Sequence, residues 1–307
     1  MTDLPGPAVE DDPATRMLAA ALPDMRAVKI KGWLICTAAV VVTVALMMLA
    51  ATAPGDRLQF MLFAAFPGFF AVGATVRWVR RSHERAVLPT ISEAFGLLHE
   101  KSPRGFFETL PKNFIPQGGR RTVDDMMNGK VAGRAFRFAE CKTETGGKNS
   151  STLFQGVVIE VQASGTVPEF LIASEKETKG FLFFKGKVQV QDMQLVHQAT
   201  GHNGETYGLW ARSDAPGRMV GLRAFMDRVI ALGPRVLGNS TLFSLVSTGR
   251  YYYISLRHKR DLFRIGGMLS SEDQVIRQIR AAATELAHPI DLAGQILQAE
   301  EALLAAK

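Results

Sequence analysis

Two apolar runs near the N-terminus constrain this chain more than any other feature. Residues 32–53 and residues 58–76 contain no Asp, Glu, Lys, Arg or His. An α-helix rises about 1.5 Å per residue, so about 20 residues cross a hydrocarbon core of about 30 Å. The four residues between the runs include Pro54 and Gly55, a pair that favours a turn. The pattern predicts a hairpin of two transmembrane helices.

Two other interpretations of the apolar runs are a cleaved signal peptide and a buried core hairpin. A signal peptide has a short apolar stretch close to the N-terminus, whereas here a tail of 28 residues with five Asp or Glu comes first and the apolar run is longer. A core helix of this length without one charge is unusual in a domain of this size. Membrane spans therefore explain the runs better.

The orientation of the hairpin follows from the basic residues that flank it. Arg26 and several other basic residues lie at its two outer ends, whereas the turn holds one Asp and one Arg. Because cytoplasmic flanks carry the excess of Lys and Arg, both termini should face the cytoplasm from a multi-pass position in the inner membrane. A tryptophan at each outer end suits the headgroup layer. The expected interface anchors are Lys29, Lys31, Trp33, Arg77, Trp78, Arg80 and Arg81.

The second run has a face of small residues, formed by Ala64, Gly68 and Ala71. Such a face allows close packing against the first span or against another copy of the chain, so a homo-oligomer through the hairpin stays open. Pro67 lies midway along the run and predicts a kink. Neither run contains an ionisable residue, which argues against an ion or substrate path through the bilayer.

The sequence divides into a polar tail (1–28), the transmembrane hairpin (29–81, with spans at about 32–53 and 58–76) and a soluble domain (82–307). Residues 82–100 have a helical pattern with a bend at Pro89. Alternating patterns then predict a β-hairpin from 131–138 and 151–161, and strands at 170–173, 181–184, 187–196, 205–211, 241–246 and 250–256. Helical spacing predicts one helix over 222–230 and another from 271, which Pro289 should separate from a last helix. The expected class is α+β with a mostly antiparallel sheet.

Several short motifs in this chain resemble a known bacterial family. They are ERAVLP at 84–89, DDMMNG at 124–129, FRFAE at 136–140, LFQG at 153–156, YGLWARSD at 207–214 and YYYISL at 251–256. Together with the helical hairpin, these motifs look like the bacterial domain of unknown function family 3137. The resemblance covers most of the chain beyond the N-terminal tail. It implies a membrane-anchored architecture and brings no assigned reaction or catalytic residue.

A search for catalytic and metal-binding patterns indicates neither a cofactor nor a metal site. The two cysteines, Cys36 and Cys141, form no disulfide framework and have no metal-ligand spacing. His197 and His202 lie close together with only Glu205 as a further ligand, which favours a solvated loop over a metal site. Glu140 and Glu160 lie on the two strands of the predicted β-hairpin. Cross-strand ion pairs explain these two glutamates as well as an acid/base dyad does.

The net charge of +7 and the pI of about 9.5 would suit nucleic acid. Much of the positive charge lies beside the apolar runs, however, where anionic lipid is the simpler partner. The densest basic group outside these flanks is a possible contact patch, formed by Arg257, Lys259, Arg260 and Arg264. Its neighbouring tyrosines are explained more simply by a packed strand than by nucleic-acid binding.

Two functional hypotheses from different classes follow. The favoured one is a non-enzymatic, membrane-tethered domain that binds a protein or lipid partner at the cytoplasmic face, because no familiar catalytic signature is present. The alternative is a membrane-anchored, hydrolase-like enzyme with an active site of unrecognised design. A pocket with convergent polar groups and shifted pKa values would favour the enzyme, and a broad apolar or basic surface would favour the binder.

Overall fold

The computed structural model divides the chain into two compact units. The hairpin unit comprises Met1–Ile91 and Phe263–Thr284, and the sheet unit comprises Ser92–Leu262 and Glu285–Lys307. The expected domains, 1–28, 29–81 and 82–307, divide the chain differently, because no local pattern marks 263–284 as a neighbour of the helices. The structure describes residues 13–52, 57–112, 114–116, 118–147, 149–174, 193–201, 204–211, 218–232, 241–259 and 262–305.

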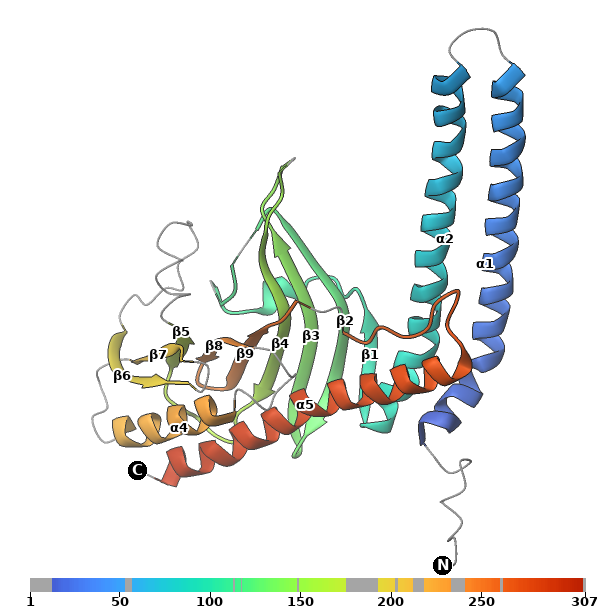
Figure 1. Cartoon of the computed structure of the whole chain (residues 1–307). Coiled ribbons are helices and arrows are strands. Elements are labelled where there is room, and N and C mark those ends of the chain that lie inside the picture. Colours follow the sequence, from blue (N-terminus) through green and yellow to red (C-terminus); the bar gives the residue numbers. More distant parts are fainter. Residues whose placement is uncertain are drawn as a thin grey trace, which may run out of the picture. The chain divides into compact units, whose positions relative to one another are not determined.

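The hairpin unit contains two long antiparallel helices, α1 (Pro13–Thr52) and α2 (Arg57–Ala94), drawn in blue and cyan in Figure 1. Both are long and apolar enough to cross a membrane, over Ala19–Thr52 and Leu62–Ala94. Their large apolar side chains point outward, with Leu49 69% exposed and Phe69 79% exposed. In a water-soluble core these side chains would be buried. The structure thus confirms two apolar N-terminal helices that could span a membrane.

Close contacts at two glycines hold α1 and α2 together. A Cβ atom at Gly68 would lie 1.9 Å from the Thr43 hydroxyl oxygen on α1, and one at Gly32 would lie 2.4 Å from a Val79 methyl on α2. Only a residue without a side chain permits this separation of the two backbones. The small-residue face of the second run therefore packs on the first helix, which was one of its two expected partners.

The helix bounds correct three expectations. Helix α1 begins at Pro13, inside the stretch expected to be a polar tail. Helix α2 continues through two prolines to Ala94 instead of 100. It ends there because Gly96, with φ +69°, adopts the left-handed conformation that closes a helix C-terminus. At the other end of the chain, Pro289 lies inside the single helix α5 (Glu272–Ala305) and does not separate two helices.

The sheet unit is built on a nine-stranded sheet with the order β1-β2-β3-β4-β9-β8-β5-β7-β6, in which every described pair is antiparallel. The expected α+β class is confirmed. The strands are β1 (Leu97–Lys101), β2 (Arg120–Val131), β3 (Arg134–Glu144), β4 (Thr152–Gln162), β5 (Phe170–Ser174), β6 (Gln194–Thr200), β7 (Thr206–Ala211), β8 (Thr241–Ser247) and β9 (Tyr251–Arg257). A 3₁₀ turn, η2 (Phe107–Thr109), and helix α4 (Arg218–Leu232) complete the unit with the last part of α5.

Strands β5, β7, β8 and β9 agree with the sequence patterns to within one residue. Three other strands do not: β1 lies mostly in a stretch expected to be helical, most of β2 lies where no strand was expected, and β6 extends to Thr200, past the expected end at 196. The first β-hairpin also differs. The expected strand 131–138 contains a chain reversal, because Ala132 and Gly133 both have positive φ, at 49° and 75°. Two such residues form the tight turn that joins β2 to β3. The expected strand at 181–184 and most of the one at 187–196 lie outside the described residues.

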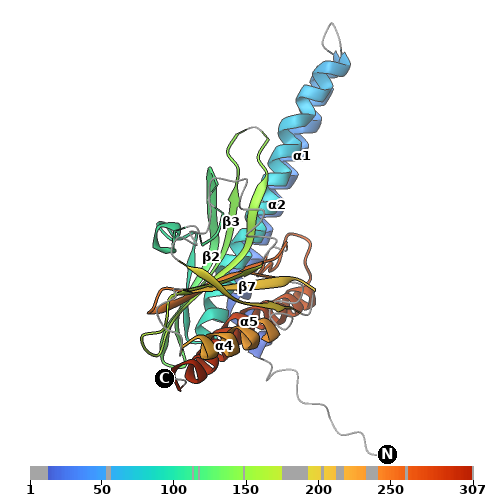
Figure 2. The same ribbon diagram turned by 90° about the vertical axis from the view of Figure 1, so that its left-hand side faces the viewer.

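The two faces of the sheet carry different layers. On one face, the Phe225 ring of α4 stacks on Tyr252 of β9, with ring centroids 5.7 Å apart. Helix α4 and the end of α5 lie side by side in Figures 1 and 2. Because side chains alternate along a strand, the neighbouring Tyr253 faces the opposite layer, where it contacts Phe114. Apolar side chains therefore pack on both faces of the central strands.

A buried carboxylate attaches α5 to the sheet unit. Glu300 is fully buried and accepts hydrogen bonds from the backbone N–H of Ser164, at 3.0 Å to each oxygen, and from the Ser164 hydroxyl, at 2.6 Å. Burial, followed by the charge of Glu300, raises the pKa of the Tyr252 hydroxyl, which therefore stays protonated. The carboxylate is stabilised by donors that only the folded chain brings to it.

Replacing Glu300 with Ala should destabilise the protein by about 2 kcal/mol, because the charge-assisted hydrogen bonds of this buried carboxylate to Ser164 are lost. For a unit of this size the loss corresponds to a melting temperature lower by roughly 4–8 °C. Thermal unfolding of the full chain in mild detergent, followed by circular dichroism, measures the shift. Glu301→Ala is the matched control, since its exposed side chain should change stability by less than about 0.5 kcal/mol. Equal effects of both substitutions would contradict this role for Glu300.

Candidate functional site

A cavity with a volume of about 900 Å³ lies within the hairpin unit. Helix α1 contributes Trp33 and Val40 to its walls, and α2 contributes Val72 and Val76. The remaining wall comes from residues far away in the sequence, the segment 264–270 and the first turns of α5. We call this space the juxtamembrane cavity, because it begins beside the apolar runs and ends among their basic flank.

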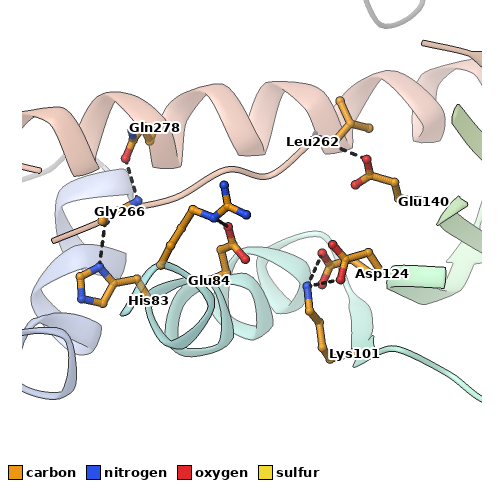
Figure 3. A network of polar contacts seen from close by, with 11 residues as sticks. His83, Glu84, Lys101, Asp124, Glu140, Leu262, Gly266 and Gln278 are labelled. Atoms are coloured by element: carbon orange, nitrogen blue, oxygen red, sulfur yellow. Dashed lines mark hydrogen bonds and ion pairs between the residues drawn. The ribbon is translucent and has the colours of Figure 1, made fainter. Parts of the chain in front are cut away.

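The segment 264–270 is fixed to the hairpin through His83 on α2. The His83 Nδ1 atom accepts a hydrogen bond of 3.2 Å from the backbone N–H of Gly267, so the ring proton must be on Nε2. The Nε2 atom in turn lies 3.1 Å from the Met25 carbonyl oxygen of α1. One neutral imidazole therefore connects the segment with both helices. Figure 3 shows its bond to the segment.

Further contacts complete the attachment of this segment. The N–H of Gly266 donates to the Gln278 side-chain oxygen at 2.7 Å, and Lys29 Nζ donates to the Ser270 carbonyl at 3.0 Å. The Cys36 and Met268 sulfur atoms are 3.8 Å apart. Gly266 has φ +70°, and a Cβ atom there would lie 2.4 Å from His83 Nδ1, so this position requires glycine.

The lining of the cavity is apolar at one end and basic at the other. Its charged residues are Arg77, Arg80 and Arg264, and no Asp or Glu lines it. Arg80 Nε lies 3.5 Å from the carboxylate of Glu84. Arg77 and Arg264 are exposed and form no ion pair with a described residue. The basic end therefore has an unbalanced positive charge.

The seven expected interface anchors have different positions. Trp33, Arg77 and Arg80 line the cavity, and Lys29 bonds to Ser270 as described above. Lys31, Trp78 and Arg81 are exposed and do not line it. The sequence pattern identified these residues by their charge or aromatic ring. The segment 264–270, which completes the cavity beside Trp33, Arg77 and Arg80, has no distinctive sequence pattern apart from Gly266-Gly267.

The expected basic patch includes residues with unlike surroundings. Arg257 donates to the Leu153 carbonyl at 3.1 Å and lies over the Phe243 ring, so it is part of the packed sheet. Lys259 is exposed in the sheet unit, and Arg260 lies outside the described residues. Arg264 belongs to the hairpin unit, where it lines the juxtamembrane cavity.

A second polar cluster lies in the sheet unit, on β1 and β2. His99 Nε2 donates to one oxygen of the Asp125 carboxylate at 2.8 Å, and Lys101 donates to the other at 2.9 Å. Lys101 also reaches Asp124, at 2.8 Å, because an irregularity between Val123 and Met126 brings both aspartates to this position (Figure 3). The side chains of His99 and Asp125 are 5% and 4% exposed.

The pKa values in this cluster follow from its hydrogen bonds. Burial alone would raise the pKa of Asp125, but the bonds from His99 and Lys101 and the charge of Lys101 outweigh burial and leave it below its usual value. Burial alone would lower the pKa of Lys101, but the two aspartates raise it. No described hydroxyl or thiol bonds to His99, and its side chain is enclosed by the surrounding residues.

Other residues considered for catalysis are separated by the fold. Arg137 and Glu160 pair directly across β3 and β4, as the cross-strand interpretation expected. Glu140 accepts a bond from the backbone N–H of Leu262, at 3.3 Å, and points to the opposite face, so it forms no dyad with Glu160. Burial raises the pKa of the Cys141 thiol, which makes it a poor nucleophile.

Metal ligation finds no support in the part of the chain that the structure describes. No group of three or more His, Cys, Asp or Glu side chains in these residues could hold a metal ion. His197 lies on β6 with its Nε2 atom 3.5 Å from an Asp227 oxygen, and His202 falls outside the described residues.

Comparison with known proteins gives one similar solved structure. No protein-family model matches the sequence, and no curated protein matches it. The crystal structure of the mycobacterial trehalose monomycolate transport factor A, TtfA, is similar with a TM-score of 0.36 and 10% sequence identity. The match covers 64% of this chain and 90% of that one. At this identity and score the likeness is too low to transfer a function.

Replacing Asp125 with Asn should lower stability at neutral pH by about 2 kcal/mol, because His99 and Lys101 lose a charged acceptor. The folded-state pKa of Asp125 lies below the unfolded value of about 3.9, so its contribution is present above about pH 4 and disappears as the pH falls through the folded value. Melting curves of the full chain between pH 3 and pH 7 give the difference in melting temperature between the unsubstituted protein and Asp125→Asn. This difference should become smaller as the pH approaches 3. Asp124→Asn, with a side chain 54% exposed, should cost less than about 1 kcal/mol. A difference in melting temperature that stays constant with pH would contradict the lowered pKa of Asp125.

Proposed function

We propose that this protein is a membrane-tethered binding protein whose helical hairpin crosses the inner membrane and leaves both termini in the cytoplasm. The exposed apolar surface of α1 and α2 carries this proposal, because two helices that expose side chains such as Phe69 require an apolar solvent. The basic residues at the outer ends of both apolar runs support the orientation. Membership of the bacterial domain of unknown function family 3137 agrees with this architecture and is part of the proposal.

The partner class that the site supports best is lipid. The juxtamembrane cavity joins an apolar wall to a basic end, which complements an amphiphile better than a folded protein surface. Binding is also supported over catalysis, because the buried polar cluster around Asp125 is closed to substrate and the thiol of Cys141 is fully buried. Because the hairpin holds the protein in the membrane, its effective concentration relative to a lipid ligand is raised without any new contact.

Cysteine labelling tests the spanning topology in the full chain. The two native cysteines, Cys36 and Cys141, are 7% and 1% exposed, so they give little background. In spheroplasts, a membrane-impermeant maleimide should label Asp56→Cys in the turn between the apolar runs. The same reagent should label Lys259→Cys, on an exposed position of the sheet unit, only after permeabilisation.

Both variants should also stay in the membrane fraction after an alkaline carbonate wash, because two spans cannot be removed by raising the pH. Labelling of Lys259→Cys in sealed spheroplasts would contradict the orientation. Release by carbonate would show that the helices lie on a surface instead of crossing the bilayer. The unsubstituted chain is the control for labelling of the native cysteines.

A further inference from the structure

We propose that the juxtamembrane cavity binds one anionic phospholipid, with the phosphate at the three arginines and an acyl chain along the valine-lined wall. This inference rests on the proposed function, since a lipid can enter the cavity from the bilayer only if the hairpin spans the membrane. It adds a ligand class and the residues that would recognise it.

The apolar wall faces the region that lipid chains would occupy. Val40 and Val41 on α1 are 53% and 62% exposed, and Val76 on α2 is 42% exposed, so the wall is continuous with the outer apolar surface of the helices. A volume of about 900 Å³ lies near the upper end of the range for small-molecule sites, roughly 300–1,000 Å³. The cavity therefore has room for a headgroup and part of a chain.

The polar end offers donors and positive charge, and no carboxylate lines it, although Glu84 pairs with Arg80 from outside the cavity. The guanidinium groups of Arg77 and Arg264 have no ion-pair partner among the described residues. An arginine fork matches two phosphate oxygens, which makes arginine the preferred side chain for this group. Gln274 lines the same end. Its side-chain oxygen accepts the Ser271 N–H at 3.0 Å, which leaves its amide hydrogens available.

The lining distinguishes an anionic lipid from two other ligands. A soluble phosphate would use the arginines but would leave the valine wall in contact with water, at a cost proportional to the apolar area. A zwitterionic lipid would fill the wall, but its own cationic group would compete with the arginines for the phosphate. An anionic phospholipid satisfies both ends, and Leu269, 82% exposed on the segment 264–270, extends the apolar surface beside the entrance.

Quenching of Trp33 fluorescence by brominated lipid measures binding directly, because Trp33 lines the cavity. The full chain, with Trp78 and Trp210 replaced by Phe, is placed in phosphatidylcholine nanodiscs that contain a small fraction of lipid brominated on its chains. Brominated phosphatidylglycerol should quench Trp33 at a lower fraction than brominated phosphatidylcholine and should reach saturation. Random contact with bulk lipid would give the same quenching for both.

The arginine variants assign the preference to the cavity. Arg77→Gln with Arg264→Gln should lower the preference for phosphatidylglycerol by about fivefold for each arginine removed. Arg85→Gln with Arg277→Gln removes the same charge from exposed positions of the hairpin unit that do not line the cavity, and should keep the preference. Replacing Arg77 and Arg264 with Lys should retain most of it, which checks that a loss reflects charge and not misfolding.

Three outcomes would overturn the inference: equal quenching by the two brominated lipids, equal losses in both double-Gln variants, or displacement of brominated phosphatidylglycerol by an equal concentration of inorganic phosphate. The last result would assign the arginines to a soluble phosphate. Failure of the proposed function is distinguishable, because a chain that does not span would not incorporate into nanodiscs. A chain that incorporates without lipid preference would contradict the inference about the cavity alone.

Discussion

Helices α1 and α2 expose large apolar side chains along most of their length, and in water each of these would contribute an unfavourable free energy of about 25 cal/mol per Å². An apolar environment removes this cost, so the surroundings of the hairpin decide whether its fold is stable. The contacts between the helices are made by small groups, such as Gly68 against Thr43, and bury little apolar area. The segment 264–270 and the juxtamembrane cavity are built on this pair of helices and depend on it.

The imidazole of His83 on α2 bonds both to α1 and to the segment 264–270. Its two nitrogens face Gly267 and Met25, residues that are far apart in the sequence, and satisfy buried backbone groups on both. A protonated ring would have no lone pair for the Gly267 N–H, and a serine or leucine could not reach both groups. The connection that His83 makes between the segment and both helices therefore requires one tautomer of its neutral ring.

Local patterns were sufficient to predict the elements that have a strong charge-free or alternating pattern. Charge-free runs indicated the two helices, and period-two alternation located β5, β7, β8 and β9 within a few residues. The turn at Ala132-Gly133 was missed because Ala rarely adopts positive φ, and nothing nearby signalled a reversal. The cavity could not be predicted either, because it brings together residues such as His83 and Gly267, which are 184 positions apart. Arg264 was noticed as a basic residue, but only the fold shows which groups surround it.

The cluster of His99, Lys101 and Asp125 lies on β1 and β2, and β1 is the last strand at one end of the described sheet. Any open sheet presents unpaired backbone groups at its ends, where a strand of another molecule can attach and begin aggregation. Strand β1 is only five residues long and carries His99, Glu100 and Lys101 in succession. His99 and Lys101 are largely buried in their contacts with Asp125, so a newly arriving strand would chiefly have to desolvate the exposed carboxylate of Glu100. The charged residues of this short strand thus oppose self-association at the end of the sheet.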